Sequence, residues 1–93
     1  MAEQNTLLTM LKVDLGIAST GYDARLTQIL ETSEKAIIAE GASTLDKEKL
    51  EDAQLIVMYA AWIWRRRDGG EGMPRMLRWS LNNRILGEKA RAE

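Results

Sequence analysis

The sequence predicts a small all-α protein, a single domain of about four helices with a long central apolar third helix. Of its 93 residues 45% are hydrophobic, yet Phe is absent and Pro occurs once. The apolar content is mainly Leu, Ile, Ala and Met, which favour helices over strands. Apolar residues also recur at spacings of three and four. A chain this short has one thin core, so residues 1–93 are expected to form one helical domain.

The first helix is expected to begin at a cap formed by Asn5 or Thr6 and to end at Leu15. Gly16 is placed to adopt the left-handed conformation that ends a helix, which would fold Ile17 back onto Leu11. The apolar side of this helix consists of Leu7, Leu8, Leu11 and Leu15.

The second helix is expected from about Tyr22 to Glu40. Thr20 and Asp23 have capping-box spacing at its start, and Gly41 ends it. Its predicted core stripe consists of Tyr22, Leu26, Ile29, Leu30, Ser33 and Ile37. The opposite face should be solvated.

The third helix is expected from about Leu45 to Arg67, after a second capping box made by Ser43 and Asp46. Its core stripe would consist of Leu50, Ala53, Val57, Ala60, Ala61 and Trp64. Most of its remaining surface is also apolar, with Leu55, Ile56, Met58, Tyr59, Trp62 and Ile63. A helix that is apolar nearly all round must be covered on more than one side.

Residues 68–72 include three glycines and are interpreted as a flexible connection. Pro74 then fits the first turn of a fourth helix, where a missing N–H is tolerated. The residues expected to point inward are Met76, Leu77, Leu81 and Ile85, with Trp79 as a further candidate. Residues 87–93 lack apolar spacing and are predicted to form a mobile C-terminal tail.

The composition argues against an enzyme. Without Cys or His the chain has no thiolate nucleophile, none of the usual zinc ligands and no neutral-pH proton shuttle. The close carboxylates, Glu31 with Glu34 and Glu48 with Glu51 and Asp52, are expected to face water beside lysines. The glycines of residues 69–72 lack the preceding strand and the Lys-Ser/Thr of a phosphate-binding loop. We expect no catalytic residue, cofactor or metal.

We also expect no membrane association. The most apolar run, residues 53–64, is far shorter than the ~20 residues that cross a bilayer. The polar, acidic start of the chain does not resemble a signal peptide.

Charge divides the chain into two halves. Residues 1–64 contain 5 basic and 10 acidic side chains, whereas residues 65–93 contain 8 and 4. One interpretation is a small helical DNA-binding regulator whose fourth helix reads bases and whose arginines at 65–67 contact phosphates. Its candidate base contacts are Arg75, Arg78, Asn82, Asn83 and Arg84. The other interpretation pairs the acidic half of one copy with the basic half of the next, head to tail, which makes a ring when the rotation closes. The arginines at 65–67 would also stabilise a helix C-terminus on their own.

Several segments resemble the head-tail connector, or adaptor, family of tailed phages. They are LTMLKVDLGI at residues 8–17, YDARL at 22–26, VMYAAW at 57–62 leading into three arginines, GMPRMLR at 72–78 and LNNR at 81–84. The last two are similar to members found in prophages of Gram-positive bacteria. The resemblance covers nearly the whole chain.

The resemblance implies a structural protein of the virion neck that is made in the host cytoplasm. Subunits of such connectors form a head-to-tail ring, about twelve in the virion, beneath the portal protein. The ring extends the DNA channel, helps to retain packaged DNA and offers a docking surface for neck or tail completion proteins. DNA passes through it without specific binding, and the C-terminal region reaches the portal.

On this interpretation the subunit or partner interface contains an apolar group and a basic group. The predicted interface residues are Met58, Tyr59, Trp62, Arg65, Arg66, Arg67, Arg75 and Arg78. Trp64 is expected in the core. Glu31 and Glu34 are candidates to face the channel, where like charge would keep DNA from adhering.

Overall fold

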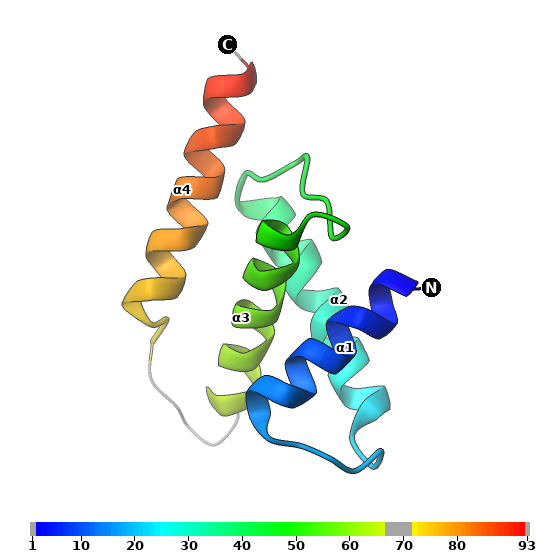
Figure 1. Ribbon diagram of the computed structural model, residues 1–93. Helices are drawn as coiled ribbons and strands as arrows, with labels where there is room; N and C mark the ends of the chain where they lie inside the picture. The colour runs from blue at the N-terminus through cyan, green and yellow to red at the C-terminus, as the bar shows by residue number, and fades with distance from the viewer. Residues whose placement is uncertain (1, 67–71, 93) are drawn as a thin grey trace.

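The computed structural model describes residues 2–66 and 72–92, and all regular secondary structure in these ranges is helical (Figure 1). The four helices are α1 (Ala2–Leu15), α2 (Asp23–Glu40), α3 (Leu50–Arg66) and α4 (Arg75–Ala92). The predicted all-α class with four helices is therefore confirmed.

Helix α3 is the central element of the fold and contacts each of the other three helices (Figure 1). Helix α4 lies along one side of it, while α1 and α2 cross on the other side and behind. The apolar side chains of α3 that are buried are Ala53, Leu55, Ile56, Val57, Tyr59, Ala60 and Ala61. This helix is thus covered on several sides, as its composition predicts, and its own chain supplies most of the cover.

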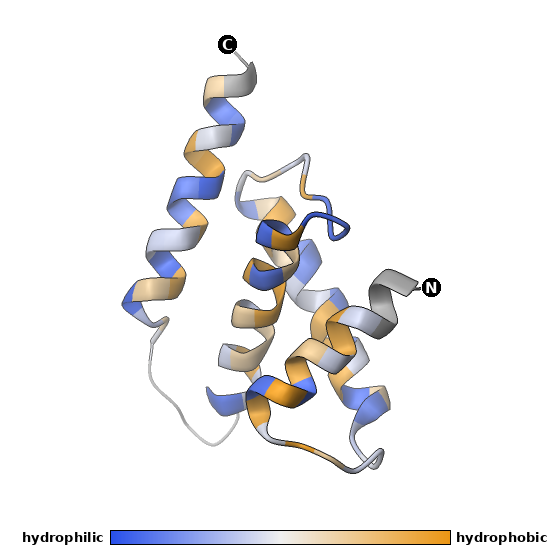
Figure 2. Ribbon diagram, viewed as in Figure 1, coloured by the Kyte–Doolittle hydropathy of each residue, from blue (hydrophilic) through white to orange (hydrophobic). Residues whose placement is uncertain are grey.

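The core is built from leucine and isoleucine contributed by all four helices. The largest fully buried apolar side chains are Leu7, Leu11, Leu26, Leu30, Ile37, Ile56, Leu77 and Leu81. Ser33 is also fully buried, and its hydroxyl donates to the Ile29 carbonyl at 2.8 Å, so it needs no partner from outside α2. Figure 2 shows the hydrophobic sides of α1, α2 and α3 turned toward one another.

The predicted helix stops at Gly16 and Gly41 are both confirmed. Gly16 has φ +73° and Gly41 has φ +134°, values that favour glycine. The N–H groups that follow fold back, Ile17 donating to the Lys12 carbonyl at 2.9 Å and Ala42 to the Ile37 carbonyl at 3.4 Å. Both ends are therefore closed by the Schellman arrangement, which satisfies carbonyls left over at a helix terminus.

Helix α2 begins within one residue of its predicted start, but its predicted cap is wrong, and α1 begins at Ala2 instead of at a cap formed by Asn5 or Thr6. The cap residue of α2 makes no side-chain cap hydrogen bond, and Asp23 instead pairs with Lys12 at 2.7 Å. Helix α3 begins at Leu50 rather than near Leu45. The Asp46 carboxylate accepts the Glu48 N–H at 3.0 Å, which stabilises a turn in place of the helix. Short polar side chains compete for several backbone and side-chain partners, so cap spacing alone does not locate a helix start.

Two aliphatic residues do not lie where the periodicity places them. Leu50 is 64% exposed at the first residue of α3, where the first turn faces the core through Ala53 instead. Met76 is 66% exposed, since α4 packs through Leu77 and Leu81 and thereby turns Met76 outward.

Two aromatic residues expected in the core lie at its edge instead. Trp64 is partly buried, and Tyr22 is 48% exposed just before α2 begins. Their rings meet edge-to-face with centroids 5.3 Å apart. The pair therefore covers the margin of the core, where the polar edge of each ring can stay in contact with water.

Helix α4 continues through Gly87 to Ala92, so the segment predicted as a tail begins inside a helix. Glu88, within that segment, bonds to the connection between α2 and α3. Polar contacts can fix the end of a helix even where no apolar residues recur at helical spacing. The composition of residues 87–93 therefore did not indicate that α4 continues there. That the end of the chain moves in the free subunit stays a prediction.

Two leucines in helices separate the contribution of burial from that of helix propensity. Leu81 is fully buried and Leu50 is mostly exposed. Leu81→Ala should lower the free energy of unfolding by about 2 to 5 kcal/mol, because it removes buried methyl groups and leaves a cavity. Leu50→Ala should change it by less than about 0.5 kcal/mol. Urea unfolding followed by circular dichroism measures both values, and equal losses would contradict this placement of α3 and α4.

Candidate functional site

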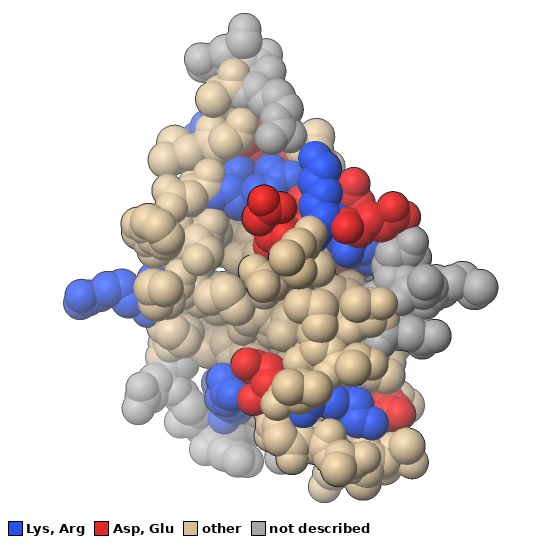
Figure 3. Space-filling view, in the orientation of Figure 1, with Lys and Arg blue, Asp and Glu red and all other residues tan. Residues whose placement is uncertain are grey.

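An open groove, the α3–α4 groove, lies between the second half of α3 and the start of α4. Its volume is about 530 Å³, and its apolar lining comprises Met58, Ala61, Trp62, Pro74, Met76 and Leu77. Arg65, Arg66 and Asp14 stand at its border. Figure 3 shows an uncharged band across this side of the molecule, with charged side chains gathered above and below it.

Trp62 is the best-supported aromatic side chain of the groove. Tyr59, which is 9% exposed, meets it edge-to-face with ring centroids 5.4 Å apart. On another side the Arg66 guanidinium lies 4.4 Å from the Trp62 ring centroid, within range of a cation–π interaction. The two neighbours hold the indole in one orientation, so Tyr59 supports the groove rather than lining it.

The predicted basic residues do not form one patch. Arg65 lies at the groove, where it pairs with the Asp14 carboxylate at 3.5 Å. Arg78 turns toward the end of α2 and meets Glu40 at 3.5 Å. Arg75 is exposed at the first turn of α4. Arg67 lies outside the described residues.

The two carboxylates expected to face a channel lie on α2, away from the groove. Glu31 is exposed, whereas Glu34 is half-buried and pairs with Lys47 at 3.6 Å. Their role at a channel stays a prediction.

Helix α4 has a second apolar face that the chain leaves open. We call it the α4 outer stripe, and it consists of Met76, Trp79, Asn83 and Leu86. Its three apolar members are 61 to 66% exposed. Their spacing of three, four and three residues puts them on one side of the helix, opposite the buried face. The same spacing in the sequence indicates such a face, but Met76 was predicted to point inward.

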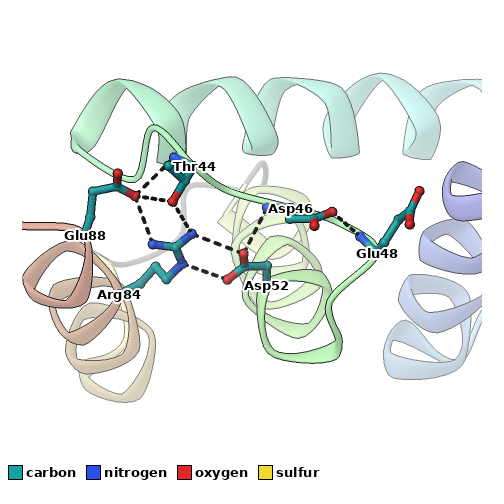
Figure 4. Close-up of polar contacts among 6 residues, drawn as sticks. All are labelled: Thr44, Asp46, Glu48, Asp52, Arg84 and Glu88. Atoms are coloured by element: carbon teal, nitrogen blue, oxygen red, sulfur yellow. Dashed lines mark hydrogen bonds and ion pairs between the residues drawn. The ribbon is translucent and has the colours of Figure 1, made fainter. Parts of the chain in front are cut away.

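The α4 latch is a polar cluster that joins α4 to α3 and to the connection before α3, and it comprises Thr44, Asp52, Arg84 and Glu88 (Figure 4). The Arg84 guanidinium donates to both Asp52 oxygens, at 2.8 and 3.3 Å, and to Glu88 at 3.2 Å. Glu88 also accepts from the Thr44 hydroxyl, the Thr44 N–H and the Ser43 hydroxyl.

The latch shifts the ionisation of its members. Burial alone would raise the pKa of Asp52, but the Arg84 guanidinium and the Asp46 N–H hold that pKa below its ordinary value. Hydrogen bonds from the hydroxyl and the N–H of Thr44 lower the pKa of Glu88 to about 2. The Asp52 carboxylate raises the pKa of Arg84. All three groups therefore stay charged over the physiological pH range.

Asp52 and Arg84 are the functional residues whose surroundings were predicted wrongly. Asp52 was expected to face water, yet it is 4% exposed. Arg84 was a candidate base contact, yet it is engaged by two carboxylates. The spacing of Arg84 and Glu88 by four residues could have predicted their ion pair on one face of a helix. No local pattern could have predicted that Asp52, 32 residues earlier, also pairs with Arg84.

Other chemistries are not indicated in the part of the chain that the structure describes. No group of three or more metal-binding side chains occurs there. No helix within residues 2–66 and 72–92 combines the length and apolar character that a bilayer span requires.

Comparisons with protein-family models, with curated proteins and with solved structures find no match to this chain.

Acid should weaken the latch through Glu88. The pKa of the Glu88 carboxylate is lowered to about 2 in the folded state. Such a group stabilises the folded state at pH values above its pKa in the unfolded chain. This stabilisation is lost as the pH falls from about 5 toward 2. Glu88→Gln should therefore unfold more easily than the natural chain at pH 7, and the gap should close toward pH 2.

Urea unfolding at a series of pH values measures that gap. Thr44→Val retains the carboxylate but removes a donor, so its gap should be smaller and close over the same range. A gap for Glu88→Gln that does not change with pH would show that Glu88 contributes only packing.

Duplex DNA should bind weakly. The formal net charge is −1, and Arg78 and Arg84 are already paired with carboxylates. We expect a Kd no better than ~10⁻⁴ to 10⁻⁶ M at physiological salt and independent of sequence. Fluorescence anisotropy with several labelled duplexes measures it. Nanomolar binding to one sequence would favour the alternative of a DNA-binding regulator.

Proposed function

We propose that this protein is a structural head-tail connector of a tailed phage or prophage. Its subunits assemble as a ring of about twelve beneath the portal protein, in the virion neck. The ring extends the DNA channel, helps to retain packaged DNA and presents a surface on which neck or tail completion proteins dock. Its function is binding to proteins rather than catalysis.

The observation that best supports this proposal is the uncovered apolar surface of α4. Met76, Trp79 and Leu86 are each more than 60% exposed, although Leu77 and Leu81 on the same helix are almost completely buried. Large exposed apolar side chains that cluster on one face are typical of protein interfaces. Trp is also among the residues that contribute most to binding at such interfaces.

The ion pairs of the α4 arginines favour the connector proposal over the alternative of a DNA-binding regulator. Of the five candidate base contacts, Arg78 and Arg84 are bound to carboxylates of the same chain. The arginines of α4 therefore help to position the helix. What α4 then presents outward in its first half is the indole of Trp79, which suits contact with another protein.

Binding to portal-bearing heads tests the proposal. Purified protein should co-sediment with DNA-filled heads of the phage that encodes it, before tails are attached. Trp79→Ala should reduce binding by tenfold or more, because a central interface Trp contributes about 2 kcal/mol or more. Its melting temperature should change little, since the indole is 61% exposed.

Val13→Ala is the matched control, because Val13 is 77% exposed on α1, away from α4. This variant should bind as the natural chain does. Failure of the natural chain to bind heads at any concentration would contradict the connector proposal, as would its absence from purified virions.

A further inference from the structure

We propose that the α3–α4 groove of one copy receives Leu50 and its acidic neighbours from a second copy. This inference rests on the proposed function in one respect, that the chain associates with itself. It adds which two surfaces of neighbouring copies are in contact, and that they are different surfaces, so that the copies associate head to tail.

The groove supplies an apolar socket with a basic border. Met58, Trp62 and Met76 are only partly covered by the chain, and Leu77 lies beneath them. Among the described residues at the border, Arg65 and Arg66 outnumber the one carboxylate, that of Asp14. An apolar side chain that carries negative charge beside it fits such a socket in shape and in sign.

Leu50 is an apolar projection with acidic neighbours. It is 64% exposed at the first residue of α3. Glu48 and Glu51 beside it are exposed as well. Residues 46–52 contain four carboxylates and two lysines, a formal charge of −2. One of those lysines, Lys47, is already paired with Glu34.

Leu86 is the other strongly exposed leucine, and it fits the socket less well. It is 61% exposed, and the charged side chains within four residues of it, Arg84, Glu88 and Lys89, carry a formal charge of +1, against −2 around Leu50. A net positive charge would be repelled by Arg65 and Arg66 at the border of the groove. Charge therefore selects Leu50 over Leu86 as the occupant.

The α3–α4 groove and Leu50 lie toward opposite ends of α3. Helix α3 has 17 residues and is about 25 Å long, with Leu50 at its first residue and the groove along its second half. A contact between two copies then leaves one groove and one Leu50 unused, so further copies can join in the same direction. Contacts of this kind close into a ring or continue as a filament.

Cysteine cross-linking tests the contact, because the natural chain has no Cys. Leu50→Cys and Met58→Cys are made as separate variants, mixed in equal amounts and oxidised with copper phenanthroline. The expected product is a dimer that contains one of each variant, identified by mass spectrometry. The two positions lie eight residues, or about 12 Å, apart along one helix, so a single chain cannot form this disulfide.

The double variant should yield a ladder of covalent oligomers, because every copy then presents both cysteines. The matched control mixes Leu86→Cys with Met58→Cys, and it should give at least tenfold less mixed dimer. In sedimentation, Leu50→Lys should weaken self-association at least tenfold, whereas Ile38→Lys, at an exposed position on α2, should not.

Equal yields from the two mixtures, or no mixed dimer at millimolar protein, would overturn this contact. Oligomers seen in sedimentation without a cross-link between the Leu50→Cys and Met58→Cys variants would overturn it as well. Binding of the natural chain to portal-bearing heads is measured separately, so failure of this contact and failure of the connector proposal are distinguished.

Discussion

The ion pair between Asp52 and Arg84 determines how α4 lies against the other helices. Its closest atoms are 2.8 Å apart, and Arg84 and Asp52 keep only 16% and 5% of their side-chain surface exposed. Taking these charges out of water has a large cost, which the pair offsets only because each group has further hydrogen-bond partners. Removal of Arg84 leaves the buried Asp52 carboxylate with the Asp46 N–H but without its counter-ion, whereas removal of Asp52 leaves Arg84 with Glu88. The groove, the outer stripe and the position of Trp79 all depend on this placement of α4.

The latch explains why α4 tolerates so little apolar burial of its own. Leu77 and Leu81 are its two buried side chains, and Ile85 is partly covered. Two leucines alone would hold a helix of 18 residues weakly. With polar contacts made near its C-terminal end, the first half of the helix is free to present Met76 and Trp79 outward.

Sequence patterns predicted the helical class, both glycine stops and most of the core, because these depend on local geometry and on apolar periodicity. Gly16 and Gly41 are required by backbone angles that few other residues adopt. The capping contacts of α2 and the starts of α1 and α3 were not predictable in the same way. Thr20, Ser43 and Asp46 have capping-box spacing, but Ser43 bonds to Glu88 across the fold and Asp46 to its own turn. Met58 and Trp62, which the apolar surface of α3 predicted as interface residues, line the groove, and their contact with a partner stays a prediction. The pairing of Asp52 with Arg84 was not predicted, since it depends on how α4 packs.

Gly41 links two parts of the fold in a way that bears on how this sequence can change. A Cβ atom added there would lie 3.1 Å from Cγ2 of Ile85, and the residue also has a positive φ. Any larger side chain at position 41 would therefore strain the end of α2 and press on α4 together. The φ of +134° lies far outside the left-handed region that Asn adopts, so a smaller residue at position 85 would relieve the contact but not the backbone. Position 41 should therefore remain glycine among homologues whatever residue stands at position 85.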